Sequence, residues 1–299
     1  MNETMNDMTF PPVSAGEDSP VWNGGAFIRC GKSTRVLAYE VGESGWSDEL
    51  TELHESVTES GAHFIDVASR DHAVNELKRT LGTKPVSIME VGCSAGHLLA
   101  DMRRSLPNAT LTGGDYTLGT LIKLGEKMPG IPLVRFNLAD SPLPPDTYDA
   151  MVLLNVLEHI EDDVAATKHI ARMLRPGGVA VIEVPAGPEL FDDYDRQLQH
   201  FRRYTLPGIC GVIERAGLVV ERQNYLGALI YPAFYLAKKL SQSRPKASSE
   251  REQHVAHAIG ATSRFNAIGH AIMSLEETLG RAVTFPRGIR CVVTARKPL

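Results

Sequence analysis

Two carboxylates and two glycines stand at spacings that suit a ligand with a ribose. Glu90 lies shortly before Gly92, and Gly96 follows one turn later. Glycines let the backbone turn tightly and approach a ligand closely. A carboxylate before such a turn would repel a pyrophosphate but would attract a ligand that carries a cation and hydroxyl groups. Asp115 stands about 20 residues further on, where an acidic side chain can reach a ribose diol.

The turn differs from two common nucleotide-binding motifs. A dinucleotide fingerprint requires a third-position glycine, and this chain has Ser94 there. A P-loop requires Gly-Lys-Ser/Thr, which this turn lacks; Gly31-Lys32-Ser33 has no upstream glycine and predicts a turn. No catalytic Ser/Tyr/Lys set is visible either, so a nicotinamide enzyme is only a weak alternative.

Strands and helices that alternate along the chain must position these residues. Residues 86–91 are an apolar run of strand type, and apolar residues then recur at helical spacing from Leu98 to Leu106. Alternation with short connections predicts a parallel, doubly wound α/β sheet. Because ligands bind at the carboxyl ends of such strands, we expect Gly92, Asp115, Asn137 and Asn155 to converge on one crevice.

Five motifs in this order resemble those of the class I S-adenosylmethionine (SAM)-dependent methyltransferases. They are the glycine turn, the strand that ends at Asp115, residues 133–149 with Asn137 where an adenine-binding Asp is usual, the strand and loop of 150–160, and the Pro-Gly-Gly turn and strand of 174–185. The resemblance covers His63 to the C-terminus. It implies a Rossmann-like, seven-stranded sheet whose last strand, 290–296, is antiparallel.

The resemblance also implies SAM as the cofactor and S-adenosylhomocysteine as the product. The residues that it places at the cofactor are Glu90, Gly92, Cys93, Ser94, Gly96, Asp115, Tyr116, Asn137, Leu138 and Asn155.

Methyl transfer from SAM is an in-line displacement that mainly needs the reactants aligned, and a base can help. His200 follows the fifth core strand, in a segment that resembles the family's "G-H-x-R-R-Y-T" with Gln199 for the glycine. Its imidazole can titrate near neutral pH. Alternatively, His200, Arg202 and Tyr204 pin this loop by hydrogen bonds. The candidate catalytic residues are His159, His200, Arg203 and Tyr204.

Glu158-His159 lies where quinone-pathway O-methyltransferases carry Glu-x-x-Glu-His, which can hold a divalent metal. Here Asn155 replaces the first carboxylate. A role at the start of a helix is therefore favoured, and no metal is expected.

Composition narrows the class of protein. The chain has 299 residues, 43% hydrophobic, and a net charge of −5 without a basic tract, which disfavours nucleic-acid binding. The loop within residues 150–160 also lacks the Asn/Asp-Pro-Pro-Tyr/Phe motif of nucleic-acid amino methyltransferases. Four scattered cysteines predict neither zinc nor a disulfide framework. No secretory signal or transmembrane stretch is visible, so we expect a cytoplasmic protein; a homodimer is left open.

The expected organisation has four parts. Residues 1–20 form a flexible tail. Residues 21–82 form a short strand pair at 26–30 and 34–39, helices at 48–63 and 68–81, and a lid. The segment 63–70 resembles a family segment that closes over the pocket; alternatively, it docks the helix through Phe64. Residues 83–224 and 287–299 form the cofactor-binding core. Residues 225–286 form a helical cap over the substrate pocket, with helices at 225–240 and 254–279.

These observations predict a SAM-dependent methyltransferase that acts on an oxygen, nitrogen or carbon atom of a small or medium acceptor. A sugar, a lipid-linked molecule or a natural-product scaffold would fit, and the apolar cap leaves room for a partly apolar substrate. An anionic acceptor would suit Arg202 and Arg203. The alternative is a SAM-binding regulatory or assembly protein without turnover.

Overall fold

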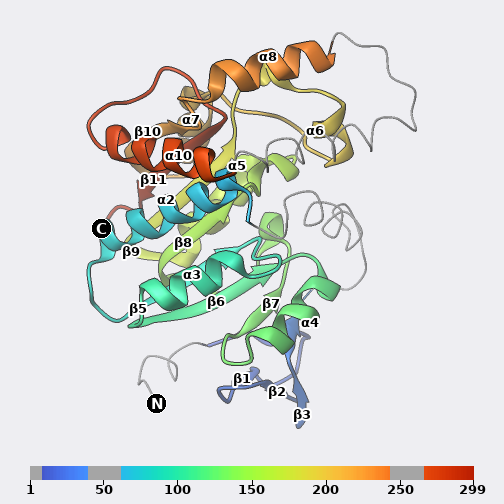
Figure 1. The fold of residues 1–299 in the computed structure, drawn as a ribbon. Coiled ribbons are helices and arrows are strands. Elements are labelled where there is room, and N and C mark those ends of the chain that lie inside the picture. The colour runs from blue at the N-terminus through green and yellow to red at the C-terminus, as the bar shows by residue number, and fades with distance from the viewer. Residues whose placement is uncertain (1–8, 40–61, 243–265) are drawn as a thin grey trace.

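The computed structural model describes residues 9–39, 62–242 and 266–299, which form a sheet between two layers of helices (Figure 1). The expected helix at 48–63 lies almost entirely outside these residues, as does the first part of the helix expected from residue 254.

The central sheet has eight strands in the order β10-β11-β9-β8-β5-β6-β7-β4. The seven-stranded, mostly parallel sheet that the sequence predicts is confirmed, with β11 antiparallel to both β9 and β10. The bounds are β4 Val36–Ala38, β5 Val86–Val91, β6 Ala109–Asp115, β7 Leu133–Arg135, β8 Tyr148–Leu154, β9 Leu174–Pro185, β10 Val219–Leu226 and β11 Arg290–Arg296.

The eighth strand, β4, was not predicted as part of this sheet. Sequence analysis placed residues 34–39 in a hairpin, but β4 pairs in parallel with β7 at the edge. Val36 and Leu37 are buried there, whereas the hairpin strands that precede them are partly exposed. A small separate sheet contains that hairpin: β1 Val21–Trp22, β2 Phe27–Arg29 and β3 Lys32–Thr34.

Helices cover both faces of the sheet because each has one apolar side. Three helices pack on one face through a shared core: α2 Phe64–Leu81, α3 His97–Ser105 and α4 Leu118–Lys127. On the other face, α5 Asp163–Met173 and α7 Leu206–Arg215 pack into a second core. Short helical turns follow the strand ends: η2 Leu138–Asp140, η3 Leu157–His159, η4 Pro188–Leu190 and α6 Asp193–Gln197.

In the regions 63–81 and 225–286, two helices begin at other residues than expected, and a third lies elsewhere on the fold. Helix α2 begins at Phe64, not Ala68, so the expected lid segment is its first two turns. Helix α10, Asn266–Gly280, lies beside α2 in the helix layer (Figure 1). Helix α8, Tyr231–Gln242, packs against the loop after β9, where η4 lies. A cap over the acceptor therefore remains a proposal for α8.

None of the helices within the described ranges combines the length and the apolar character that crossing a bilayer requires.

Candidate cofactor site and a neighbouring histidine cluster

The glycine turn after β5 adopts a backbone that requires glycine at two positions. Gly92 has φ 76° and Gly96 has φ 80°, both in the left-handed region. A Cβ on Gly92 would lie 2.6 Å from Val156 Cγ2, and one on Gly96 would lie 2.4 Å from Leu124 Cδ1. The turn is tied to β6, because the N–H groups of Gly92 and Cys93 donate to the Gly114 carbonyl.

A cavity of about 120 Å³ opens beside this turn. It brings together six of the ten residues predicted at the cofactor, namely Glu90, Gly92, Cys93, Ser94, Gly96 and Asn155. Because pockets that enclose drug-sized ligands measure about 300–1,000 Å³, this cavity accommodates only part of SAM.

Glu90 is a buried acidic residue that lines this cavity. Its side chain is 5% exposed, and its buried Oε2 has no hydrogen-bond partner within the described part of the chain. Burial, together with the nearby charge of Asp115, raises the pKa of Glu90 well above its ordinary value. A buried carboxylate oxygen without a donor is costly, and a ligand cation removes that cost. The SAM ammonium group fits this requirement.

The other four predicted cofactor residues lie at the ends of β6 and β7 but do not line the cavity. The Asp115 carboxylate accepts hydrogen bonds from the N–H groups of Ser94 and Thr117, each at 2.9 Å. Burial outweighs these bonds and raises the pKa of Asp115. Its remaining lone pairs can still accept from ribose hydroxyls.

Of the remaining three, Tyr116 is half-buried with the Arg135 guanidinium 5.6 Å from its ring centre. Asn137 Oδ1 accepts from the Ala139 N–H and begins η2, and Leu138 is buried in the core. Leu138 therefore has a packing role in addition to any cofactor contact.

Among the residues that line the cavity but were not predicted at the cofactor, Asp66, Ser69 and Arg290 form one polar group. Arg290 on β11 contacts Asp66 and Ser69 of α2 at 2.7 and 2.6 Å, and Glu183 of β9 at 2.8 Å. Asp66, Ser69 and Arg70 share one helix face by their i, i+3, i+4 spacing, so that pattern could have found them. Arg290 carried no local signal, because only the sheet order brings it there.

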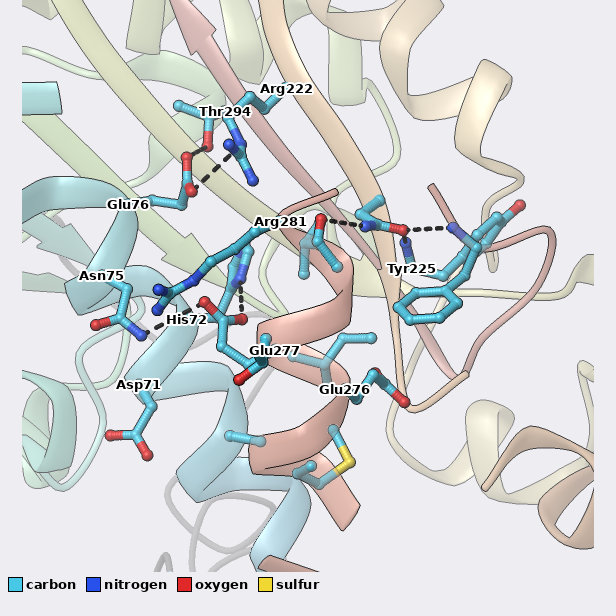
Figure 2. A pocket seen from close by; sticks show the side chains of 18 of the residues that line it. Asp71, His72, Asn75, Glu76, Arg222, Tyr225, Glu276, Glu277, Arg281 and Thr294 are labelled. Carbon is cyan, nitrogen blue, oxygen red and sulfur yellow. Dashed lines mark hydrogen bonds and ion pairs between the residues drawn. The ribbon is translucent and has the colours of Figure 1, made fainter. Parts of the chain in front are cut away.

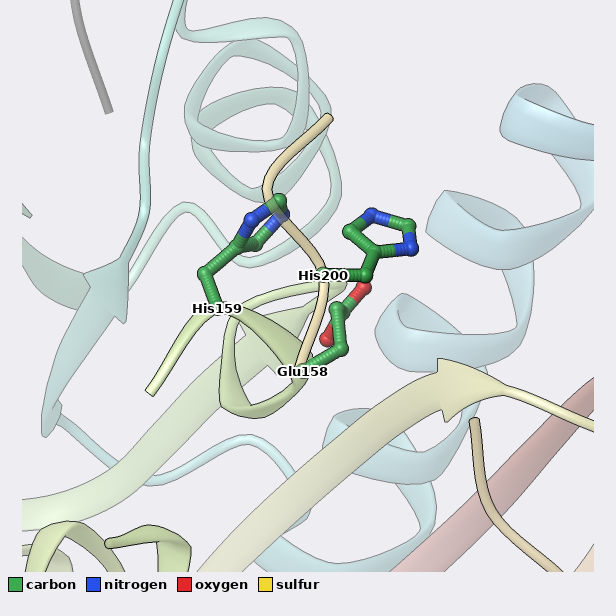
Figure 3. A group of neighbouring side chains, drawn as sticks. All are labelled: Glu158, His159 and His200. Atoms are coloured by element: carbon green, nitrogen blue, oxygen red, sulfur yellow. The ribbon is translucent and has the colours of Figure 1, made fainter. Parts of the chain in front are cut away.

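Glu158, His159 and His200 form a second group, here called the histidine cluster (Figure 3). Glu158 and His159 belong to η3 after β8, and His200 lies on the loop after β9. The His159 and His200 rings meet edge to face with centroids 4.6 Å apart. The Phe201 N–H donates to the Glu158 carbonyl at 2.8 Å, which fixes one loop against the other.

Burial shapes the electrostatics of this cluster. Glu158 is fully buried, and neither carboxylate oxygen has a hydrogen-bond partner among the residues described. Desolvation raises the pKa of Glu158 to about 8. His200 Nδ1 lies 2.9 Å from Asp195 Oδ1, and Asp195 is itself fully buried.

Arg203 and Tyr204, which were predicted among the catalytic residues, both have hydrogen-bond partners within the protein. Arg203 is buried; its Nε donates to Asp195 at 2.8 Å and its Nη1 to the Ala186 carbonyl. The Tyr204 hydroxyl donates to Asp163 Oδ2 at 2.9 Å. Both side chains hold the loop after β9 in place, and the catalytic role predicted for them stays a prediction.

The expected pairing of an anionic acceptor with Arg202 and Arg203 is also unsupported. Arg202 Nη1 pairs with Asp163 at 2.7 Å, and its Nη2 donates to the Glu161 carbonyl. Because both guanidinium groups have partners inside the protein, neither offers a free charge to an acceptor.

A larger cavity of about 660 Å³ lies between α2, α10 and β10 (Figure 2). It contains none of the predicted site residues. Its polar groups pair across it: His72 Nδ1 lies 3.1 Å from Glu277, and the Thr294 hydroxyl donates to Glu76 at 2.8 Å. It lies apart from the glycine turn, so we do not assign the reaction to it despite its size.

Sheet order, the antiparallel β11, and a glycine turn beside a buried acid together define a class I, SAM-dependent methyltransferase domain. A methyltransferase-domain family matches residues 54–223, more than half of the 299 residues. The chain belongs to this methyltransferase-domain family.

Two curated relatives are consistent with this family assignment. The chain is 30% identical over 139 residues to a protein of Mycolicibacterium smegmatis described as a "probable S-adenosylmethionine-dependent methyltransferase", covering 45% of this chain and 52% of that one. It is 26% identical over 172 residues to the trans-aconitate 2-methyltransferase of Deinococcus radiodurans, covering 54% and 66%. The chain thus spans about half to two thirds of the length of these relatives.

Two solved structures share the fold. Phosphoethanolamine N-methyltransferase 2 of Haemonchus contortus in complex with SAM has a TM-score of 0.54 at 16% identity, covering 77% of this chain and 53% of that one. The cyclase SpnF has a TM-score of 0.56 at 17% identity, covering 84% and 93%. At these identities the likeness concerns the fold alone.

Proposed function

We propose that this protein transfers the methyl group of SAM to an oxygen, nitrogen or carbon atom of a small or medium acceptor. One observation carries the proposal: the buried Glu90 Oε2, which lacks a partner among the described residues, faces a cavity formed by the glycine turn. A cation-bearing nucleoside supplies what this carboxylate lacks.

SAM, when bound, supplies an electrophilic methyl group on a sulfonium. In this proposal Glu90 holds its ammonium group, and Asp115 accepts hydrogen bonds from its ribose hydroxyls. Tyr116 and Asn137, at the next strand ends, would flank the adenine. The protein then mainly has to align acceptor and methyl group and exclude water.

The acceptor is assigned to the loops after β8 and β9, beside the cofactor cavity. Asn155 lines that cavity, and η3 with His159 follows it directly. Helix α8 covers the neighbouring loop, since Lys238 pairs with Asp192 at 2.7 Å. This position supports a cap over the acceptor. Because Arg202 and Arg203 are paired internally, a neutral, partly apolar acceptor such as a sugar or natural-product scaffold is favoured over an anionic one.

Calorimetric titration with SAM and S-adenosylhomocysteine tests the cofactor assignment. We expect micromolar binding of both, weakened at least tenfold by Glu90→Gln, because the amide lacks the charge that holds the ammonium group. Glu126→Gln is the matched control, because Glu126 is exposed on α4. Failure of wild-type protein to bind either compound would overturn the proposal.

Turnover separates an enzyme from a SAM-binding regulatory or assembly protein. S-adenosylhomocysteine formation is measured with cell extract as the source of acceptors. Product that depends on both extract and protein supports the enzyme. Tight SAM binding without product from any extract fraction favours the regulatory alternative.

A further inference from the structure

We propose that Glu158, His159 and His200 bind one divalent transition-metal ion, with zinc as the best match to the ligand set. The sequence did not predict this site, because it showed only one carboxylate and one imidazole in η3. The fold adds the second imidazole from the loop after β9 (Figure 3).

The ligand chemistry and spacing fit a metal of this kind. Two imidazoles and one carboxylate are common ligands of zinc and neighbouring first-row ions. One ligand atom from each of the three side chains lies within 4.8 Å of the other two. Ligands on a tetrahedral ion with bonds of about 2.1 Å lie about 3.4 Å apart. Side-chain shifts of about 1 Å therefore close the site.

Glu158 provides an independent indication that a cation binds here. Its carboxylate is fully buried and lacks hydrogen-bond donors in the part of the chain that the structure describes. Buried acidic groups are normally paired or bound to a metal. An ion between Glu158 and the two imidazoles supplies the missing partner without any new protein contact.

Asp195 orients one of the proposed ligands. Its carboxylate lies 2.9 Å from His200 Nδ1 and also accepts from Arg203 at 2.8 Å. With the Nδ1 proton directed to Asp195, the Nε2 lone pair of His200 is left to bind a metal. Metal-binding histidines typically hydrogen-bond a carboxylate in this way.

Three protein ligands leave one coordination position open, as in catalytic zinc sites. Resting on the proposed function, we assign this position to a polar oxygen of the acceptor. The metal would then select acceptors by an oxygen atom beside the methylated position, and SAM binding itself would not need the metal.

Metal titration of the purified full-length protein tests the site. The protein is stripped with a chelator and titrated with Zn²⁺ by calorimetry and with Co²⁺ by visible absorption, which reports tetrahedral coordination. We expect one ion per chain. Glu158→Gln, His159→Ala and His200→Ala should each weaken binding at least tenfold. His270→Ala on α10, outside the cluster, should leave binding unchanged.

Two outcomes would overturn the site: no Zn²⁺ or Co²⁺ binding by the wild type, or equal binding by the wild type and all three cluster variants. Circular dichroism identifies any variant that fails to fold, and Glu158→Gln keeps the side-chain shape. SAM titration of the same metal-free sample separates the two proposals. SAM binding without metal binding refutes only the metal site, and metal binding without SAM binding refutes only the proposed function.

Discussion

At the scale of single residues, four buried acids mark the candidate site, and they fall into two pairs. Glu90 and Glu158 each carry a buried oxygen without a hydrogen-bond donor in the described ranges, whereas Asp115 and Asp195 are held by backbone or side-chain donors. The first pair is suited to bind positive charge from a ligand. The second pair positions what surrounds that ligand.

Replacing Asp115 by alanine should weaken SAM binding at least tenfold. The substitution removes the proposed ribose contact and also the acceptor for the Ser94 and Thr117 N–H groups that shape the turn. Calorimetry measures the affinity. The shape-conserving Asp115→Asn variant separates the two effects, and unchanged SAM affinity in both variants would contradict the assignment.

Replacing His200 by alanine should leave SAM affinity within about twofold and lower turnover at least tenfold. His200 does not line the cofactor cavity but lies in the cluster beside it. Calorimetry and S-adenosylhomocysteine formation give the two values. Loss of SAM affinity to the same extent as turnover would make His200 part of the scaffold.

At the scale of elements, α2 links the cofactor cavity to the rest of the fold. Its first turns provide Asp66 and Ser69 to Arg290, and its Phe64 ring packs against Gly269 of α10. A Cβ on Gly269 would lie 2.5 Å from the Phe64 ring. The close contact between α2 and α10 therefore requires a residue without a side chain at position 269.

Gly269→Ala should lower the free energy of unfolding by about 1–3 kcal/mol, because the added methyl group overpacks this contact. Gly211→Ala on α7 is the matched control. Its Cβ would meet only the flexible end of Arg215 at 3.3 Å, so the gain in helix propensity should leave stability unchanged or higher by up to about 1 kcal/mol. Urea unfolding measures both. Equal effects would show that helix propensity alone decides the outcome.

At the scale of the whole molecule, Glu76 connects α2 with two strands of the sheet. It accepts hydrogen bonds from Arg79 and from Thr294 of β11, and pairs with Arg222 of β10. Desolvation acts to raise the pKa of Glu76, but the hydrogen bonds and nearby positive charges outweigh it and lower the pKa overall. Ionised Glu76 therefore stabilises the fold.

This pKa shift predicts a pH-dependent effect of Glu76→Gln. A lowered folded-state pKa contributes stability above the unfolded-state pKa, and that contribution is lost as the pH falls through the folded-state pKa. At pH 7 the free energy of unfolding of the variant should be about 1 kcal/mol lower than that of the wild type. The difference should shrink below about pH 4. Urea unfolding at both pH values checks this, and a constant difference would assign the effect to packing.

Local patterns predicted the parallel sheet and the glycine turn, whereas the antiparallel last strand followed only from the resemblance to a known family. Apolar runs, helical spacing and glycines are readable within a dozen residues. Sequence analysis missed Arg290 at the cavity and the approach of His200 to Glu158, because these depend on which strands lie side by side. It also could not show that Arg203 and Tyr204 are buried against neighbours, since a row of polar residues does not reveal which of them are buried.

Strand β4 has a consequence for any shortened form of this protein. It covers the outer edge of β7 with only three residues, and Arg35 beside it donates to the carbonyls of Gly125, Met128 and Ile131 near the end of α4. A chain that starts after residue 39 would leave the outer edge of β7 without a neighbouring strand, although β6 would still pair with its other edge, and would leave these carbonyls without their donor. Exposed strand edges recruit other chains, so such a truncation is expected to self-associate, with the glycine turn itself intact.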